Sequence, residues 1–166
     1  MAPLDIEMAA IVQDFLKDKG IICDLENRVT MFSQNKEKIQ VHTEKGYQIE
    51  TDMVIMSAGV KPENQLAKSA GLKLGEKGGI KVDASMRTSD PYIYAAGDAV
   101  EVTDFVTGLP MMIPLAGPAN KQGRIAADNV MGRTSVFKGT QGTSVMKLFD
   151  MTVATTGVNE KSLSIT

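Results

Sequence analysis

The 166 residues carry a formal net charge of -2, 43% hydrophobic and 5% aromatic side chains, one cysteine and one histidine. This balance is typical of one globular domain or of parts of two, and the scattered basic residues exclude a nucleic-acid or anionic-membrane surface. No apolar run approaches the roughly 20 residues that span a bilayer, and the N-terminus lacks the regions of a signal peptide. Since one cysteine and one histidine provide neither a disulfide framework nor a metal site, we expect a cytoplasmic protein without a resident metal.

The first 60 residues predict an α/β arrangement with an antiparallel insert. Apolar residues recur at helical spacing over 5–19, where Asp5 is placed to cap the helix and Gly20 to end it. The strands that follow are predicted over 21–25, 28–33, 38–43 and 47–50, the last three as a β-meander. Cys23 lies in the first of them and is predicted to be a buried structural residue rather than a nucleophile. Residues 54–58 are apolar at successive positions, which predicts a strand covered on both faces, as in a parallel sheet.

The remaining residues predict two helices among short strands. The shorter helix is predicted over 64–70, and the longer one over 114–131 with Pro114 in its first turn and Gly132 at its end. The strands are predicted over 80–82, 93–96, 143–149 and 152–156, with a loop or hairpin over 101–111.

The dipeptide Gly97-Asp98 follows the predicted strand over 93–96, where open α/β sheets bind their ligands. Glycine lets a backbone approach a ligand closely, and the Asp98 carboxylate is able to accept hydrogen bonds from the vicinal hydroxyls of a sugar or ribitol chain. A second interpretation is that Asp98 caps the turn that follows it. The local residues leave both interpretations open.

The predicted helix over 114–131 opens with Leu115, Ala116 and Gly117, which carry no charge. Such a helix start exposes unpaired amide groups and the positive end of the helix dipole. A flavin ring, whose pyrimidine edge gains negative charge on reduction, suits that environment. Ordinary helix packing through Ala116 and Ala119 is the alternative, and this segment by itself favours packing.

Several segments together resemble one family. Residues 88–98 (TSDPYIYAAGD) resemble the C-terminal flavin motif of the FAD-dependent pyridine nucleotide-disulfide oxidoreductases. Residues 58–64 (AGVKPEN), 114–124 (PLAGPANKQGR) and 142–150 (GTSVMKLFD) are similar to the coenzyme A-disulfide reductase and NADH oxidase/peroxidase branch of that family. The resemblance covers essentially the whole chain in order, and it implies a C-terminal fragment of such a protein.

The resemblance implies an α/β fold built from pieces of two dinucleotide-binding domains of the Rossmann-like, three-layer type, with a β-meander. Residues 1–60 would be the second half of the NAD(P)H-binding domain and residues 61–132 the C-terminal part of the FAD-binding domain. Residues 133–166 would start an α+β dimerisation domain.

The resemblance also implies roles for particular residues. The cofactor contacts would be Gly97 and Asp98 at the ribitol of FAD, Leu115 and Ala116 at its isoalloxazine ring, and Gly59 and Val60 at the nicotinamide. Asn120 stands where some members of the family have a histidine that helps to bind the thiol substrate, and this departure leaves the preference for coenzyme A open. No residue of the chain is assigned a catalytic role.

The implied parent protein passes hydride from NAD(P)H through FAD to a cysteine and on to a disulfide such as coenzyme A disulfide. The chain has no G-x-G-x-x-G turn, and the family's redox cysteine lies further N-terminal, so we expect the chain alone to be inactive. The alternatives are an NADH oxidase or peroxidase, which reduces oxygen or peroxide, and a non-catalytic dimerisation module. Because partial domains expose strand edges and apolar helix faces, we expect a homodimer or higher self-association.

Overall fold

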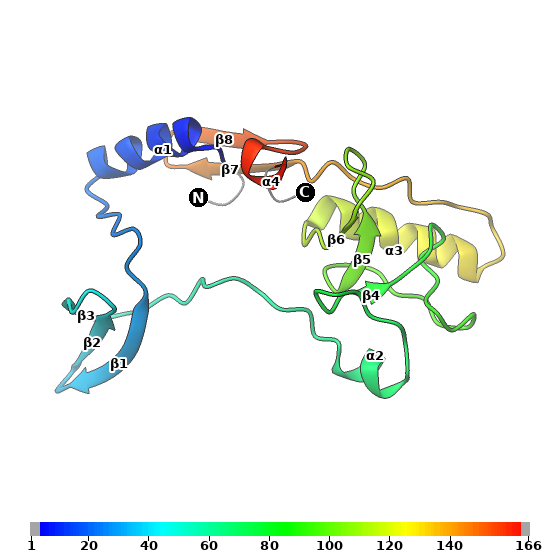
Figure 1. Cartoon of the computed structure of the whole chain (residues 1–166), viewed down its shortest axis with the longest axis horizontal. Helices are drawn as coiled ribbons and strands as arrows, with labels where there is room; N and C mark the ends of the chain where they lie inside the picture. The colour runs from blue at the N-terminus through cyan, green and yellow to red at the C-terminus, as the bar shows by residue number, and fades with distance from the viewer. Residues whose placement is uncertain (1–3, 164–166) are drawn as a thin grey trace. The chain divides into compact units, whose positions relative to one another are not determined.

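The computed structural model describes residues 4–163 of the chain. These residues form two compact units, one of residues 6–59 and the other of residues 60–163 together with residues 4 and 5. Each unit contains both helices and strands (Figure 1), so the chain has the α/β content that the sequence predicts.

The unit of residues 6–59 contains one helix and an antiparallel meander. Its elements are α1 (Ile6–Asp18), β1 (Val29–Asn35), β2 (Lys38–Thr43) and β3 (Gln48–Thr51). The strands pair in the order β1-β2-β3, and the register places Val41 of the central strand beside Phe32 on one side and Ile49 on the other. Since residues paired across neighbouring strands share a face, these three side chains form an apolar row. The predicted helix and the predicted meander are confirmed.

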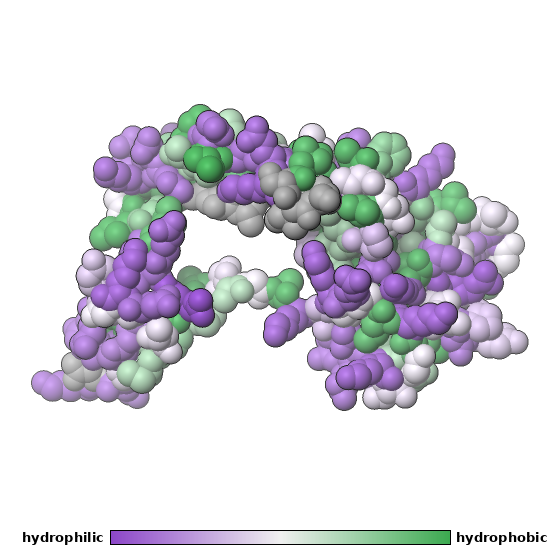
Figure 2. All heavy atoms as spheres, in the orientation of Figure 1, coloured by the Kyte–Doolittle hydropathy of each residue, from purple (hydrophilic) through white to green (hydrophobic). Residues whose placement is uncertain are grey.

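Two strands predicted in this unit are wrong. Residues 21–25 and 54–58 form no strand, and Ile22, Ile55 and Met56 are 93%, 82% and 69% exposed. A strand needs a hydrogen-bonded neighbour, and among the described residues no segment pairs with either of these. Apolar residues continue along 53–60 as an exposed segment, which carries green spheres in Figure 2. Cys23 is exposed as well, which corrects the expectation that it is buried.

The second unit carries a small mixed sheet, a long helix and a hairpin. Its elements are α2 (Gln65–Ser69), β4 (Ile80–Lys81), β5 (Val100–Thr103), β6 (Pro110–Met111), α3 (Ala116–Val130), β7 (Ser144–Leu148), β8 (Met151–Thr155) and α4 (Glu160–Leu163). In the sheet β4-β5-β6, β4 runs parallel to β5 and β6 runs antiparallel to it. The pairing of β5 with β6 confirms a hairpin over 101–111, and the antiparallel pair β7-β8 is confirmed too.

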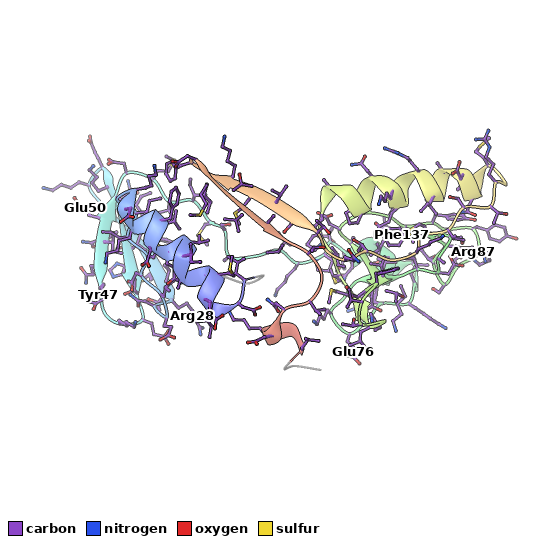
Figure 3. The ribbon with its side chains drawn as sticks, turned by 90° about the horizontal axis from the view of Figure 1, so that it is seen from above. Arg28, Tyr47, Glu50, Glu76, Arg87 and Phe137 are labelled. Carbon is purple, nitrogen blue, oxygen red and sulfur yellow. The ribbon has the colours of Figure 1, made fainter. Side chains whose placement is uncertain are left out.

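The core of this unit lies between α3 and β5. Met86, Val100, Val102 and Phe137 are each less than a tenth exposed and form its centre, and Ile125 and Ala126 of α3 are among the side chains that pack against it. Phe137, labelled in Figure 3, lies beside α3 and comes from the segment that leads from this helix to β7. The helix and the sheet are therefore held together by apolar burial, the dominant favourable contribution to folding.

The strand predicted over 93–96 is reduced to a single bridge between Tyr94 and Arg87. The Thr88 amide donates to the Ile93 carbonyl and the Ala95 amide to the Met86 carbonyl, so only one side of this segment is paired. Tyr94 and Ala95 are half-buried, whereas Ile93 and Ala96 are exposed, and the described residues supply no second neighbour that would complete a strand.

Asn129, in the last turn of α3, joins the helix to two loops. Its Nδ2 group donates to the carbonyls of Ser135 at 2.7 Å, Ile125 at 2.8 Å and Ser85 at 3.3 Å, and its Oδ1 accepts from the Ser135 amide at 3.4 Å. One side chain thus ties the end of α3 to the turn around Ser85 and to the chain that follows the helix.

We expect Asn129→Ala to lower the free energy of unfolding by about 2–3 kcal/mol, because partly buried backbone groups lose their partner. Urea unfolding followed by circular dichroism measures this change. Asn120→Ala is the matched control on the same helix, since the exposed Asn120 bonds only to its own helix at Ala116, 2.9 Å away. Its effect should stay below about 1 kcal/mol. Equal losses in both variants would contradict the role given to Asn129.

Candidate functional site

The Gly97-Asp98 turn leads directly into β5. Gly97 has a φ of +93°, a conformation that favours glycine, and its carbonyl accepts the Val100 amide at 3.3 Å. The Ala99 carbonyl accepts the Ile80 amide of β4 at 2.8 Å, which fixes the turn to the sheet. Asp98 itself is exposed, and within residues 4–163 its carboxylate accepts no hydrogen bond and forms no ion pair. The interpretation of Asp98 as a turn cap is therefore wrong, and its carboxylate is free for a ligand.

Helix α3 begins two residues later than predicted, with Leu115 as its N-cap in extended conformation (φ -133°, ψ 138°) and without a side-chain cap. Ala116 and Gly117 are exposed, and the first turn contains no acidic residue. Pro118, which has no N–H group, occupies the third position, and the Ala119 amide already bonds to the Leu115 carbonyl at 3.1 Å. Within the described residues, the amides of Ala116 and Gly117 are thus unpaired donors at the positive end of this helix.

Gln122 joins the turn to the helix. Its Oε1 accepts the Gly97 amide at 2.8 Å, and the side chain is only 2% exposed. It follows Pro118 by one helical turn, and these two are the buried residues of α3. At 1.5 Å rise per residue, Gln122 stands about 9 Å along the helix from Ala116. The structure therefore brings Gly97-Asp98 and the start of α3 into one region, through a residue that the sequence analysis did not single out.

A pocket of about 400 Å³ opens beside the first turns of α3. It is lined by Gly117, Pro118 and Lys121 of the helix, by Phe105, and by Phe137, Lys138, Gly139, Thr140, Gln141 and Thr143. Its volume lies in the usual range for small-molecule sites, and its walls combine two aromatic rings with two lysines.

Asp104 anchors the loop that carries Phe105 to this pocket. The side chain is 3% exposed, and its Oδ1 accepts the Thr107 amide at 2.7 Å, the Thr107 hydroxyl at 2.9 Å and the Val106 amide at 3.0 Å. Burial by itself would raise the pKa of Asp104, but the hydrogen bonds from Thr107 and Val106 outweigh it and hold the pKa below its ordinary value.

This lowered pKa predicts a pH-dependent contribution to stability. Since the folded-state pKa lies below the unfolded value of about 3.9, the carboxylate stabilises the fold above that pH and loses the contribution as the pH falls through the folded pKa. Asp104→Asn should cost about 1–2 kcal/mol near pH 7, where charge-assisted hydrogen bonds become neutral ones, and progressively less below about pH 4. Urea unfolding of both proteins from pH 7 to pH 3 tests this expectation, and a gap independent of pH would contradict it.

The structure does not join the other predicted site residues to this region through any hydrogen bond or pocket of the described residues that involves Asp98. Gly59 (φ +92°) is exposed and ends the first unit, and Val60, 81% exposed, begins the second. Asn120 is exposed on α3 with its Nδ2 group bonded to Ala116 of its own helix. Across the described ranges, no three His, Cys, Asp or Glu side chains gather as metal ligands, and no helix has the length and apolarity to cross a membrane.

The model of the family described as pyridine nucleotide-disulphide oxidoreductase matches residues 1–127. The chain belongs to this family. A protein named NADH oxidase from Methanocaldococcus jannaschii is 39% identical over 98% of the chain and 36% of its own length. The solved structure of reduced Bacillus anthracis CoADR-RHD is similar, with a TM-score of 0.94 and 52% sequence identity, and the match covers 99% of this chain and 29% of that one. The structure of an NAD-dependent persulfide reductase from A. fulgidus has a TM-score of 0.95 and 42% identity, and the match covers 99% of this chain and 30% of that one. The chain thus spans roughly a third of the length of the curated relatives it matches.

Members of this family use FAD and NAD(P)H. The residues at the start of α3 fit a flavin, because Ala116 and Gly117 are small and exposed and a Cβ added at Gly117 would meet no atom within 4 Å. The free Asp98 carboxylate fits the hydroxyl groups of a ribitol chain. Both segments therefore offer groups of the kind that bind a flavin, unpaired amides at one and a free carboxylate at the other.

Proposed function

We propose that the chain forms part of a flavoprotein oxidoreductase that passes hydride from NAD(P)H through FAD to a cysteine-mediated disulfide acceptor of the coenzyme A disulfide type. The membership of the family supports the reaction class. The observation that carries the assignment of the site is the free Asp98 carboxylate on a turn that Gln122 ties to the uncapped start of α3. The similarity to a persulfide reductase supports a sulfur acceptor.

Each group of the proposed site has its own task. Asp98 accepts hydrogen bonds from the ribitol hydroxyls, and Gly97 keeps the backbone beside it free of a side chain. The amides of Ala116 and Gly117 would face the pyrimidine edge of the ring, where the positive end of α3 would stabilise developing negative charge. The Leu115 amide is already bonded to the Ile113 carbonyl at 2.8 Å, so Leu115 would contact the ring without donating its amide. FAD, when bound here, would supply the ring that takes up hydride from the nicotinamide and the two electrons that reduce a disulfide involving the parent protein's cysteine. The protein supplies binding, orientation and electrostatic stabilisation.

The proposed contacts to NAD(P)H and to the acceptor come from three further residues. The exposed Gly59 and Val60 contact the nicotinamide end, where the positive φ of Gly59 lets the backbone bend without a side chain. Asn120, one helical turn beyond Ala116, contacts the thiol substrate in place of the histidine of other members. To do so its side chain must exchange its bond to the Ala116 carbonyl for one to the substrate.

The chain requires further parts for this reaction. It contains no G-x-G-x-x-G turn for either pyrophosphate, and its one cysteine, Cys23, is outside the position of the family's redox cysteine. We therefore propose that residues 1–166 alone do not oxidise NAD(P)H. The exposed apolar side chains of β7, Val145 and Met146, fit a second copy of the chain as the partner in a homodimer.

The upstream reading frame provides the test. We expect it to encode two glycine-rich turns and a cysteine, and we expect its complete product to be yellow, to contain FAD and to oxidise NAD(P)H when coenzyme A disulfide is added. A frame without these features, or a complete product that binds no FAD, would overturn the proposal.

An oxidase is the second candidate, because the Methanocaldococcus jannaschii protein that is 39% identical is named NADH oxidase. Oxygen uptake by the complete product, compared with its rate of coenzyme A disulfide reduction, separates the two functions. Oxygen consumption that exceeds disulfide reduction would favour the oxidase.

A further inference from the structure

Gln122 is the most buried polar side chain of α3, and its Oε1 has one hydrogen-bond partner within the described residues. Its exposure of 2% is matched in the same unit by apolar residues such as Met86 and Val100. A buried amide group is unfavourable unless it is hydrogen-bonded, so its presence among apolar residues calls for a specific partner. That partner is the Gly97 amide, 2.8 Å from Oε1.

The partner amide is the one N–H group of this turn that Gln122 holds, at the end of the turn farther from the bond between Ala99 and β4. Gly97 has a φ of +93°, and its N–H group takes no part in the backbone hydrogen bonds that its neighbours Ala99 and Val100 make. If Oε1 were removed, the partly buried Gly97 amide would lose its acceptor within the described residues. The Gly97 end of the turn would then lose its bond to α3, while Ala99 would stay bonded to β4, and we expect Asp98 between them to become less well positioned.

The two ends of this link are the two halves of the proposed flavin site. Asp98 follows the bonded amide by one residue, and the unpaired amides of Ala116 and Gly117 precede Gln122 by less than two turns of the same helix. The Gln122 side chain therefore links the residue before Asp98 directly to the helix that carries the unpaired amides, in addition to the packing of α3 on β5.

We propose that Gln122 is a positioning residue for the flavin, which fixes the Asp98 turn relative to the start of α3. This inference rests on the proposed function, because it needs FAD as the ligand of both segments. Gln122 touches neither reacting atoms nor substrate in this role. It acts through Gly97 and Asp98, and it pre-organises two contacts that a flexible turn would have to order on binding.

The test uses the complete product of the reading frame and three variants. Gln122→Met keeps the length of the side chain and removes the acceptor, whereas Gln122→Glu keeps an acceptor oxygen. Asn129→Ala, at the far end of α3, loses hydrogen bonds that do not involve the site and serves as the structural control. The readouts are the FAD dissociation constant below the unfolding temperature, the visible circular dichroism of bound flavin, and hydrogen exchange of the peptide that contains Gly97.

We expect Gln122→Met to weaken FAD binding about tenfold, to change the flavin spectrum and to speed exchange at Gly97. Gln122→Glu, which keeps the acceptor oxygen but buries a carboxyl group, should restore slow exchange at Gly97. Asn129→Ala should change none of the three readouts even though it lowers stability. Equal losses of FAD affinity in Gln122→Met and Asn129→Ala, or slow exchange at Gly97 in Gln122→Met, would overturn the inference. A wild-type protein that binds no FAD would instead overturn the proposed function, while the exchange measurement would still report on the link.

Discussion

Asp98→Ala is expected to weaken FAD binding to the complete protein by about a hundredfold, a larger effect on binding than we predict for any other substitution. The reason is that one carboxylate accepts hydrogen bonds from two vicinal hydroxyls, and charge-assisted bonds of this kind are about twice as strong as neutral ones. Because Asp98 has no partner within the described residues, its removal should change the free energy of unfolding by less than about 0.5 kcal/mol. Titration of the apoprotein with FAD and urea unfolding measure the two effects.

Glu76→Ala is the matched control, since Glu76 is another exposed carboxylate on a turn of the same unit and is labelled in Figure 3. It removes the same charge from the protein and should leave FAD binding unchanged, which excludes a general electrostatic effect. Equal weakening in the two variants would remove Asp98 from the site. A hundredfold loss of affinity accompanied by a comparable loss of stability would assign Asp98 a structural role instead.

The elements that the sequence predicts correctly are those whose backbone hydrogen bonds join residues close together in the chain. Helix α3 has a helical period and a glycine after it, and β7 with β8 forms a hairpin from adjacent residues. Residues 54–58 fail for the opposite reason. Their run of apolar residues predicts a strand that is covered on both faces, which requires neighbouring strands and covering elements. The described residues contain no such neighbours for this segment, and Ile55 is 82% exposed.

The candidate site divides in the same way. A glycine and a carboxylate after an apolar run, and small residues at a helix start, are local signals that made Gly97, Asp98 and Ala116 candidates, and the resemblance to the family then implied their roles. The bond between Gln122 and Gly97 joins residues 25 positions apart and has no local pattern. The only signal in the sequence was a polar residue one turn after Pro118 on what proves to be the buried face of α3. Such a residue is indistinguishable from a surface glutamine until the packing of the helix is known.

Gly139→Ala is expected to lower the free energy of unfolding by about 2–4 kcal/mol, because it combines backbone strain with a collision. Gly139 has a φ of +90°, and a Cβ there would lie 2.8 Å from the Thr103 carbonyl oxygen. This close approach allows two backbone contacts of the next residue, Thr140. The Thr140 carbonyl accepts the Phe105 amide at 3.0 Å, and Thr140 forms a parallel bridge with Asp104. The segment that carries Phe137 into the core is thereby bonded to the two residues after β5, and the oxygen that the Cβ would meet belongs to the backbone of β5, which cannot move aside as a flexible side chain would.

Gly123→Ala is the control for Gly139→Ala, because it makes the same substitution at a position where the alanine side chain meets no other atom. Gly123 lies in the middle of α3, is exposed, has no positive φ, and a Cβ there would meet nothing within 4 Å. The same substitution should therefore raise the free energy of unfolding by about 1 kcal/mol, because alanine loses less conformational entropy in a helix. Urea unfolding of the two variants should give changes of opposite sign. If the Gly139→Ala protein were as stable as wild type, the contact between residues 137–143 and β5 would contribute nothing to the free energy of unfolding. The pocket that residues 137–143 line would then not be a fixed feature of the fold.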